Sequence, residues 1–126
     1  MKRILIADDE PHIIRILKLS LERAGYKVDS ASNGEKAFSM LSEDPPDVLI
    51  SDIQMPRMTG EELCKKIQAE ILNRHFPIFI MTSRTERAHR VWAGEIPNLT
   101  FMEKPVSARE LVATIDTYFD SINPNS

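Results

Sequence analysis

The chain has 126 residues, of which 42% are hydrophobic and 28% charged, and its formal net charge is −3 at pH 7. This length accommodates one globular domain with a hydrophobic core, and the weak negative charge argues against nucleic-acid binding. No apolar stretch approaches the roughly 20 residues of a membrane-spanning helix, and the start of the chain lacks a secretory signal. Cys64 is the only cysteine and is expected to be a small buried hydrophobe. The expected location is the cytoplasm.

In the first part of the chain, strand-like and helix-like patterns alternate. An apolar run at 2–7 predicts a buried strand, and the helical pattern that follows begins near Pro11 and ends at Gly25. A weaker, alternating run at 26–31 predicts a strand at a sheet edge. A short helix opened by Asn33-Gly34 and ended by Asp44, and a third strand at 48–51, come next.

The same alternation continues to the C-terminus. A capping box at 59–62 begins the third helix, and a second one at 107–110 begins the last helix, which has a broad apolar face. Pro97 cannot sit inside a continuing helix, so the polar helix before it should end early or the loop should be unusual. Further strands are predicted at 77–81 and 99–102, and that polar helix at about 85–94.

The sum of these elements is a (βα)5 pattern, an α/β fold with a central parallel sheet and helices on both faces. We expect one domain over residues 1–122 and a tail at 123–126. The pattern leaves no internal repeat or linker to explain.

Polar side chains follow four of the predicted strands. Asp8-Asp9, Asp52, Thr82 and Lys104 come at the ends of the first, third, fourth and fifth strands. Since the carboxyl ends of parallel strands share one edge of a sheet, these side chains should converge there. Crowded carboxylates repel one another and need a cation, for which Mg²⁺ is the natural candidate. The residue types suit phosphoryl transfer to Asp52, with Lys104 and Thr82 contacting phosphoryl oxygens.

With these residues in place, the chain resembles the receiver domain of two-component response regulators. The matching elements are Asp8-Asp9, the stretch 52–60, Thr82-Ser83 and Lys104-Pro105, in this order and at strand ends. The resemblance extends from Lys2 to about Ile122. It implies a doubly wound, flavodoxin-like fold with strand order 2-1-3-4-5.

The resemblance also implies a role for each site residue. Asp52 is similar to the phosphoacceptor and Asp9 to a direct Mg²⁺ ligand, while Asp8 would bind the metal directly or through water. Gln54 occupies the position that supplies a backbone carbonyl to the metal. Lys104 corresponds to the lysine that binds the phosphoryl group.

Further positions are implied to act in switching and in rate control. Thr82 is similar to the switch hydroxyl and Phe101 to the switch aromatic, and the Lys104–Pro105 peptide bond is expected to be cis. Gln54 and Arg84 lie two residues after Asp52 and Thr82, at positions that influence phosphorylation and hydrolysis rates in the family.

The implied function is a phosphoacceptor signalling switch of a two-component phosphorelay with Mg²⁺ as cofactor. The phosphoryl donor would be a histidine kinase, a phosphotransfer protein or a small molecule, and the domain would catalyse its own phosphorylation and dephosphorylation without substrate turnover. Its partner downstream would be a target protein or an effector domain. A phosphorylation-dependent homodimer is left open, and no nucleic-acid or membrane contact is expected of this domain.

Two alternatives differ in class. The first is a receiver-like interaction module that works without phosphorylation. The second is a phosphatase similar to the haloacid dehalogenase type, but such enzymes carry Asp-x-Asp after the first strand, and here Gln54 stands where the second carboxylate is needed. Arg84, Arg87 and Arg90 form either a solvated stripe or a docking patch. His12, His75 and His89 are expected to be structural or surface residues, with His12 near the site.

Overall fold

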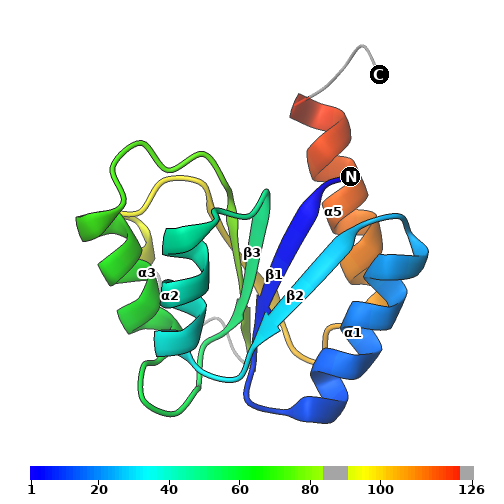
Figure 1. The fold of residues 1–126 in the computed structure, drawn as a ribbon, viewed down its shortest axis with the longest axis horizontal. Coiled ribbons are helices and arrows are strands. Elements are labelled where there is room, and N and C mark those ends of the chain that lie inside the picture. Colours follow the sequence, from blue (N-terminus) through cyan, green and yellow to red (C-terminus); the bar gives the residue numbers. More distant parts are fainter. Residues whose placement is uncertain (84–90, 123–126) are drawn as a thin grey trace.

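The computed structural model of the chain describes residues 1–83 and 91–122. It contains a five-stranded parallel sheet with the order β2-β1-β3-β4-β5 (Figure 1). The predicted fold class, strand order and edge position of the second strand are therefore confirmed. The strands are β1 (Arg3–Ala7), β2 (Lys27–Ala31), β3 (Val48–Asp52), β4 (Ile78–Thr82) and β5 (Leu99–Glu103).

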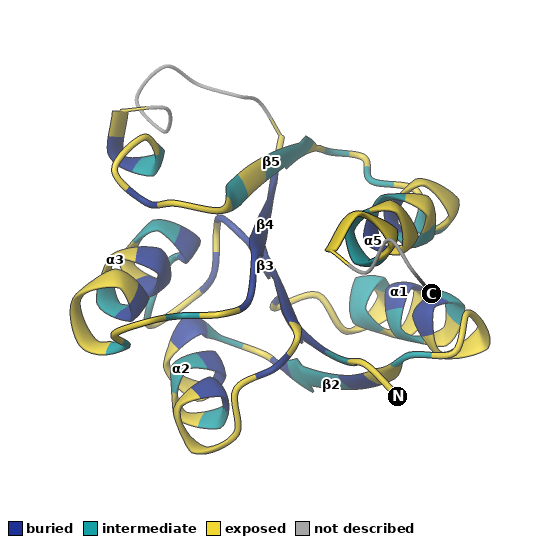
Figure 2. Cartoon of the chain, turned by 90° about the horizontal axis from the view of Figure 1, so that it is seen from above, coloured by how far each residue is buried: buried dark blue, intermediate teal, exposed yellow. Residues whose placement is uncertain are grey.

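Helices cover both faces of the sheet (Figure 2). On one face lie α1 (Pro11–Arg23) and α5 (Ala108–Ile122), and on the other lie α2 (Gly34–Glu43) and α3 (Gly60–Glu70). The chain moves outward in one direction from β1 to β2 and in the other from β1 to β3, so the strand order reverses between β1 and β3. Open α/β sheets bind their ligands at the carboxyl ends of the strands beside such a reversal.

Two hydrophobic cores form because alternate side chains of each strand point to opposite faces. Leu5 of β1 and Ile80 of β4 pack toward α2 and α3, whereas Ile6 and Met81 pack toward α1 and α5. Every residue of β3 and β4 is buried, since both strands are covered on both faces. This explains why these strands read as continuous apolar runs without alternation.

The predicted helix signals are present in the structure. Thr59 and Glu62 form the reciprocal capping box of α3, with each side chain accepting the other residue's backbone N–H at 3.1 and 3.0 Å. Ser107 Oγ accepts the Glu110 N–H at 3.0 Å, which is the serine half of the second predicted box. Gly25 follows α1 with φ +100°, a left-handed conformation that glycine adopts without strain.

The segment before β5 shows how the chain accommodates Pro97. Most of the helix predicted at 85–94 lies outside the described residues, and helical structure at 91–93 ends before Pro97, as expected. The Arg74 guanidinium donates hydrogen bonds to the carbonyls of Phe76 and Pro97. Asn98 has φ +55°, and its carbonyl accepts the Ile78 N–H at 3.0 Å. These bonds attach the segment to the start of β4.

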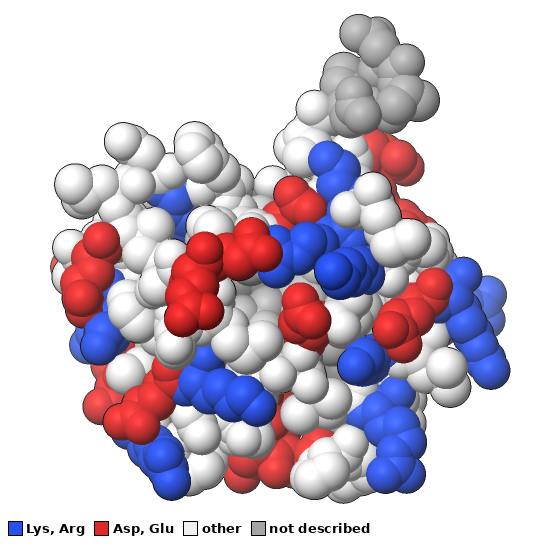
Figure 3. Space-filling view, viewed as in Figure 1, with Lys and Arg blue, Asp and Glu red and all other residues white. Residues whose placement is uncertain are grey.

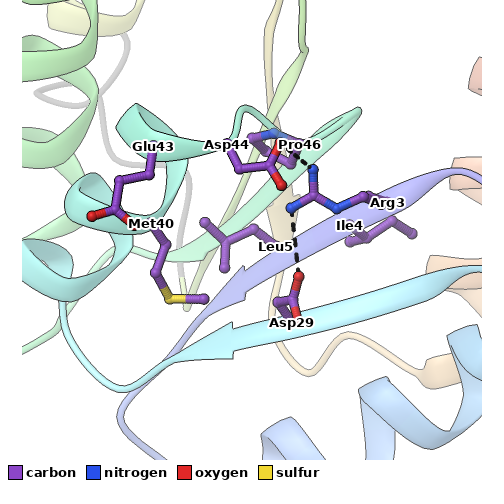
Figure 4. A pocket seen from close by; sticks show the side chains of 8 residues that line it. All are labelled: Arg3, Ile4, Leu5, Asp29, Met40, Glu43, Asp44 and Pro46. Carbon is purple, nitrogen blue, oxygen red and sulfur yellow. Dashed lines mark ion pairs between the residues drawn. The ribbon is translucent and has the colours of Figure 1, made fainter.

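A network around Arg3 joins three elements at the amino end of β1 (Figure 4). Its guanidinium lies 2.9 Å from the Asp44 carboxylate after α2 and 3.6 Å from the Asp29 carboxylate of β2. The Arg3 N–H also donates to Asp47 at 2.7 Å. The adjoining hollow of about 210 Å³ lies at the start of β1, away from the end of that strand that carries Asp8.

Acidic and basic side chains are interspersed over the face shown in Figure 3. No helix within residues 1–83 or 91–122 combines the length and apolar character needed to cross a membrane.

Removing side-chain volume from the central strand should lower stability strongly. Ile50 of β3 is completely buried, so we expect Ile50→Ala to reduce the free energy of unfolding by about 2–5 kcal/mol in urea denaturation. Ile16→Ala on α1 is the matched control: its side chain is 52% exposed, and the change should stay within about 0.5 kcal/mol. Equal losses from both variants would contradict this assignment of the core.

Candidate functional site

The residues predicted to converge do meet at one edge of the sheet. Asp8 and Asp9 follow β1, Asp52 ends β3, Thr82 ends β4 and Lys104 follows β5. The register explains the convergence, because Ala7 pairs with Ser51, Asp52 with Met81, and Thr82 with Glu103. The strands therefore end nearly level, at the lower edge of the sheet in Figure 1.

The centre of the site is an ion pair between Lys104 and Asp52. Lys104 Nζ lies 2.8 Å from Asp52 Oδ1, and the same oxygen accepts the Ile53 N–H at 2.8 Å. Asp52 is only 3% exposed, so this carboxylate is held among specific donors with little access to water. Burial lowers the pKa of Lys104, but the hydrogen bond and the negative charge of Asp52 outweigh it and leave that pKa raised.

The main chain places the Lys104 side chain. The backbone N–H of Lys104 donates to the Thr82 carbonyl at 2.7 Å, which continues the pairing of β4 and β5 past the strand ends. The peptide bond from Lys104 to Pro105 is cis. Thr82 is 2% exposed, so its hydroxyl belongs to the buried part of the site.

Four carboxylates gather beside this ion pair. Asp8, Asp9, Glu10 and Asp52 each offer one oxygen, and these oxygens all lie within 4.8 Å of one another. Glu10 was not among the predicted ligands. Its position directly after the aspartate pair and before α1 was the signal that could have identified it.

Asp8 is the most deeply buried member of the cluster. It is completely buried; its Oδ1 accepts the Glu10 N–H at 2.9 Å, while Oδ2 has no hydrogen-bond partner among the described residues. Burial raises the pKa of Asp8, the Glu10 N–H opposes this, and the charge of Asp52 raises it further. A buried oxygen without a donor, among other carboxylate oxygens, fits a hard divalent cation such as Mg²⁺.

A glycine allows the chain to pass close behind the acceptor aspartate. A Cβ atom at Gly60 would lie 2.5 Å from the Asp52 carbonyl oxygen and 2.8 Å from Ile53 Cα. The Gly60 N–H instead donates to the Ile53 carbonyl at 2.8 Å. The start of α3 is thus packed directly against the backbone that carries Asp52.

The remaining predicted positions differ in location and exposure. Phe101 is half-buried on β5, and Gln54 is exposed in the loop after β3, where its role as a backbone ligand stays a prediction. Arg84, like the rest of the predicted arginine stripe and His89, lies outside the described residues. His12 is exposed, 3.7 Å from the Glu10 carboxylate. Cys64 is fully buried, and burial raises the pKa of its thiol to about 12, as suits a buried hydrophobe.

The raised pKa of Asp8 makes a prediction about metal-free stability. A carboxyl whose folded pKa exceeds its ordinary value of 3.8 favours the fold most below that value, and loses this contribution as the pH rises through the folded pKa. We therefore expect Asp8→Asn to stabilise the protein in EDTA at neutral pH, seen as a higher midpoint in urea denaturation.

The same variant should lose the stabilisation that Mg²⁺ gives the wild-type protein. Asp120→Asn, an exposed change on α5, is the control for both measurements. A destabilised Asp8→Asn protein in EDTA, or an undiminished response to Mg²⁺, would contradict the assignment.

Comparison with known proteins identifies relatives over nearly the whole chain. The family model "Response regulator receiver domain" matches residues 4–116. The chain is 37% identical over 114 residues to the alkaline phosphatase synthesis transcriptional regulatory protein PhoP of Bacillus subtilis (strain 168), covering 90% of this chain and 47% of PhoP. It is 34% identical to the response regulator SaeR of Staphylococcus aureus (strain USA300), covering 92% and 50%. The chain thus spans about half the length of these relatives.

Solved structures agree with this result. A CheY-like response regulator receiver domain protein from Methanospirillum hungatei JF-1 superposes with a TM-score of 0.88 at 26% identity, covering 100% of this chain and 99% of that one. The chemotaxis response regulator CheY4 of Vibrio cholerae gives 0.83 at 28% identity, covering 93% and 98%. The family predicted from the strand-end residues is confirmed: the chain belongs to the response regulator receiver domain family.

Proposed function

We propose that this receiver domain is a phosphoacceptor switch in which Asp52 takes a phosphoryl group from a histidine kinase or a phosphotransfer protein. The observation that carries the proposal is the buried Asp52 carboxylate, paired with Lys104 at 2.8 Å beside the acidic cluster. An acceptor aspartate needs nearby positive charge, because phosphoryl transfer adds negative charge to a site that is already anionic.

Asp52 acts as the nucleophile. The hydrogen bonds found for its carboxylate both go to Oδ1, so we assign Oδ2 as the attacking oxygen. A P–O bond forms as the P–N bond of the donor phosphohistidine breaks, and the electron pair leaves with the imidazole nitrogen. The fixed Ile53 N–H and the Lys104 ammonium orient the carboxylate for this attack.

Residues from four different strand ends contribute to the charge balance of the site. Lys104 neutralises a phosphoryl oxygen, and the Thr82 hydroxyl donates a hydrogen bond to another. Asp8, Asp9, Asp52 and the backbone carbonyl of Gln54 are the proposed ligands of Mg²⁺, which supplies positive charge to the nucleophile and the phosphoryl oxygens when bound. This donor set is supported by the clustered oxygens and by Asp8 Oδ2, which has no hydrogen-bond partner in the described part of the chain.

The signal is a local change of charge that biases two conformations. We propose that Thr82 moves toward the phosphoryl group and that Phe101 turns into the space it vacates. Gln54 and Arg84 tune the rates of phosphorylation and of the domain's own dephosphorylation. The unit that does this is a domain over residues 1–122, with 123–126 as a tail, acting in the cytoplasm.

The output is proposed to pass to an effector domain or a downstream protein, or through a homodimer formed on phosphorylation. PhoP is a transcriptional regulatory protein of which this chain matches less than half, which supports an effector outside the matched region. Receiver domains act as signalling domains, and we propose no turnover of a substrate here.

Intact-mass measurement after incubation with acetyl phosphate and Mg²⁺ tests the acceptor. We expect the mass gain of one phosphoryl group in the wild-type protein, because acetate leaves as Asp52 attacks the phosphorus. The gain should be absent from Asp52→Asn and present in the control Asp120→Asn. Absence of the gain with every donor, a cognate kinase included, would favour an interaction module that works without phosphorylation.

A metal titration tests the ligands separately from the chemistry. Asp9→Ala removes an exposed carboxylate of the cluster, and we expect the Mg²⁺ affinity measured by isothermal titration calorimetry to fall at least about tenfold. Glu10→Gln, measured in parallel, shows whether the neighbouring carboxylate is also a ligand. An Asp9→Ala affinity equal to the wild-type value would refute the assignment of Asp9.

A further inference from the structure

We propose that Trp92 is the positioning residue that couples Phe101 to the segment before β5, so that phosphorylation of Asp52 rearranges the surface between α3 and residues 91–98. This inference rests on the proposed function. It adds a residue that neither the site chemistry nor the sequence motifs single out.

The coupling is a direct aromatic contact. The rings of Trp92 and Phe101 meet edge to face, with centroids 6.0 Å apart and an interplanar angle of 79°. Trp92 is 7% exposed and belongs to the core beneath α2 and α3, and Phe101 packs against that same core. A buried indole in this geometry constrains where the phenyl ring can lie.

Phe101 also connects this contact to the phosphorylation site. It pairs with Ile80 on β4, two residues before Thr82, and the alternation of a strand places Ile80 and Thr82 on the same face. Phe101 thus lies on the face of the sheet that carries the Thr82 side chain, and it also contacts the indole. A turn of Phe101 toward Thr82 draws its ring away from Trp92.

The far end of the segment is held in place. Arg74 donates to the Pro97 carbonyl, and the Asn98 carbonyl accepts the Ile78 N–H. Ile96 is 6% exposed within the same core, so this part of the segment is also packed. The response to a movement of Phe101 is therefore concentrated at Trp92.

Space for that response exists beside the indole. A hollow of about 210 Å³ lies between α3 and the segment, lined by Lys65, Gln68, Ala69, Trp92, Glu95 and Ile96. When Phe101 withdraws, Trp92 shifts into this hollow and changes the surface that α3 and the segment present together. The Trp92–Phe101 contact accordingly stabilises the unphosphorylated conformation.

Intrinsic fluorescence tests the coupling, since Trp92 is the only tryptophan of the chain. Emission is recorded before and after acetyl phosphate with Mg²⁺, and phosphorylation is followed by intact mass in the same samples. We expect a spectral shift in the wild-type protein and none in Asp52→Asn. In Phe101→Leu we expect phosphorylation with most of the shift lost, while Phe38→Leu, a matched change on the same core, keeps the shift.

A kinetic arm measures the direction of the coupling. Trp92→Ala should accelerate phosphorylation by acetyl phosphate about two- to tenfold, which is the rate equivalent of the free energy of one edge-to-face aromatic contact. Trp92→Phe should restore most of the wild-type rate. Circular dichroism shows whether the alanine variant is folded; if it is not, Phe101→Leu carries the same rate prediction.

The outcomes separate the two proposals. No mass gain in the wild-type protein overturns the proposed function, and this inference with it. A mass gain without a spectral shift, an undiminished shift in Phe101→Leu, or an unchanged or slower rate in the folded variant overturns the inference alone.

Discussion

Electrostatic repulsion among carboxylates is the constraint on which the site depends. Asp8, Asp9, Glu10 and Asp52 bring oxygens within 4.8 Å of one another, and Asp8 and Asp52 do so while buried. Such crowding is unfavourable unless positive charge is supplied. Lys104, which lies 2.8 Å from Asp52, supplies part of it, and a cation held by the acidic cluster would supply the rest.

The fold tolerates this electrostatic repulsion because Asp52 and Thr82 end the two fully buried strands of the sheet. Every residue of β3 and β4 is buried, and the start of α3 approaches the Asp52 backbone so closely that Gly60 has no room for a Cβ atom. A rigid support of this kind keeps an anionic cluster in place without local collapse. Phe101, by contrast, is only half-buried on the edge strand β5, where the proposed switch would have room to move.

One pair of strands, β4 and β5, carries both residues of the site and Phe101 of the aromatic contact. Lys104 donates its N–H to the Thr82 carbonyl, and Phe101, three residues earlier than Lys104, contacts Trp92. In the proposed switch, a charge that arrives at Asp52 would act first on Lys104 and Thr82, and β4 and β5 would carry its effect to the aromatic pair. Two-state coupling of this kind needs a packed element with two discrete arrangements, and the proposal assigns this part to the edge-to-face ring pair.

The sequence by itself determined the strand ends, the helix caps, the family and the charged residues of the site. It could do so because buried parallel strands are continuous apolar runs, and the polar residues that follow them stand out. It also indicated that helical structure would end before Pro97. Only the tertiary structure decided that Glu10 joins the acidic cluster, that Asp8 Oδ2 finds no donor within residues 1–83 and 91–122, and that Arg74 secures the Pro97 segment. The contact of Trp92 with Phe101 belongs to the same group. These features arise from distances between residues far apart in the chain, or from the direction of a side chain, and periodicity and spacing contain neither.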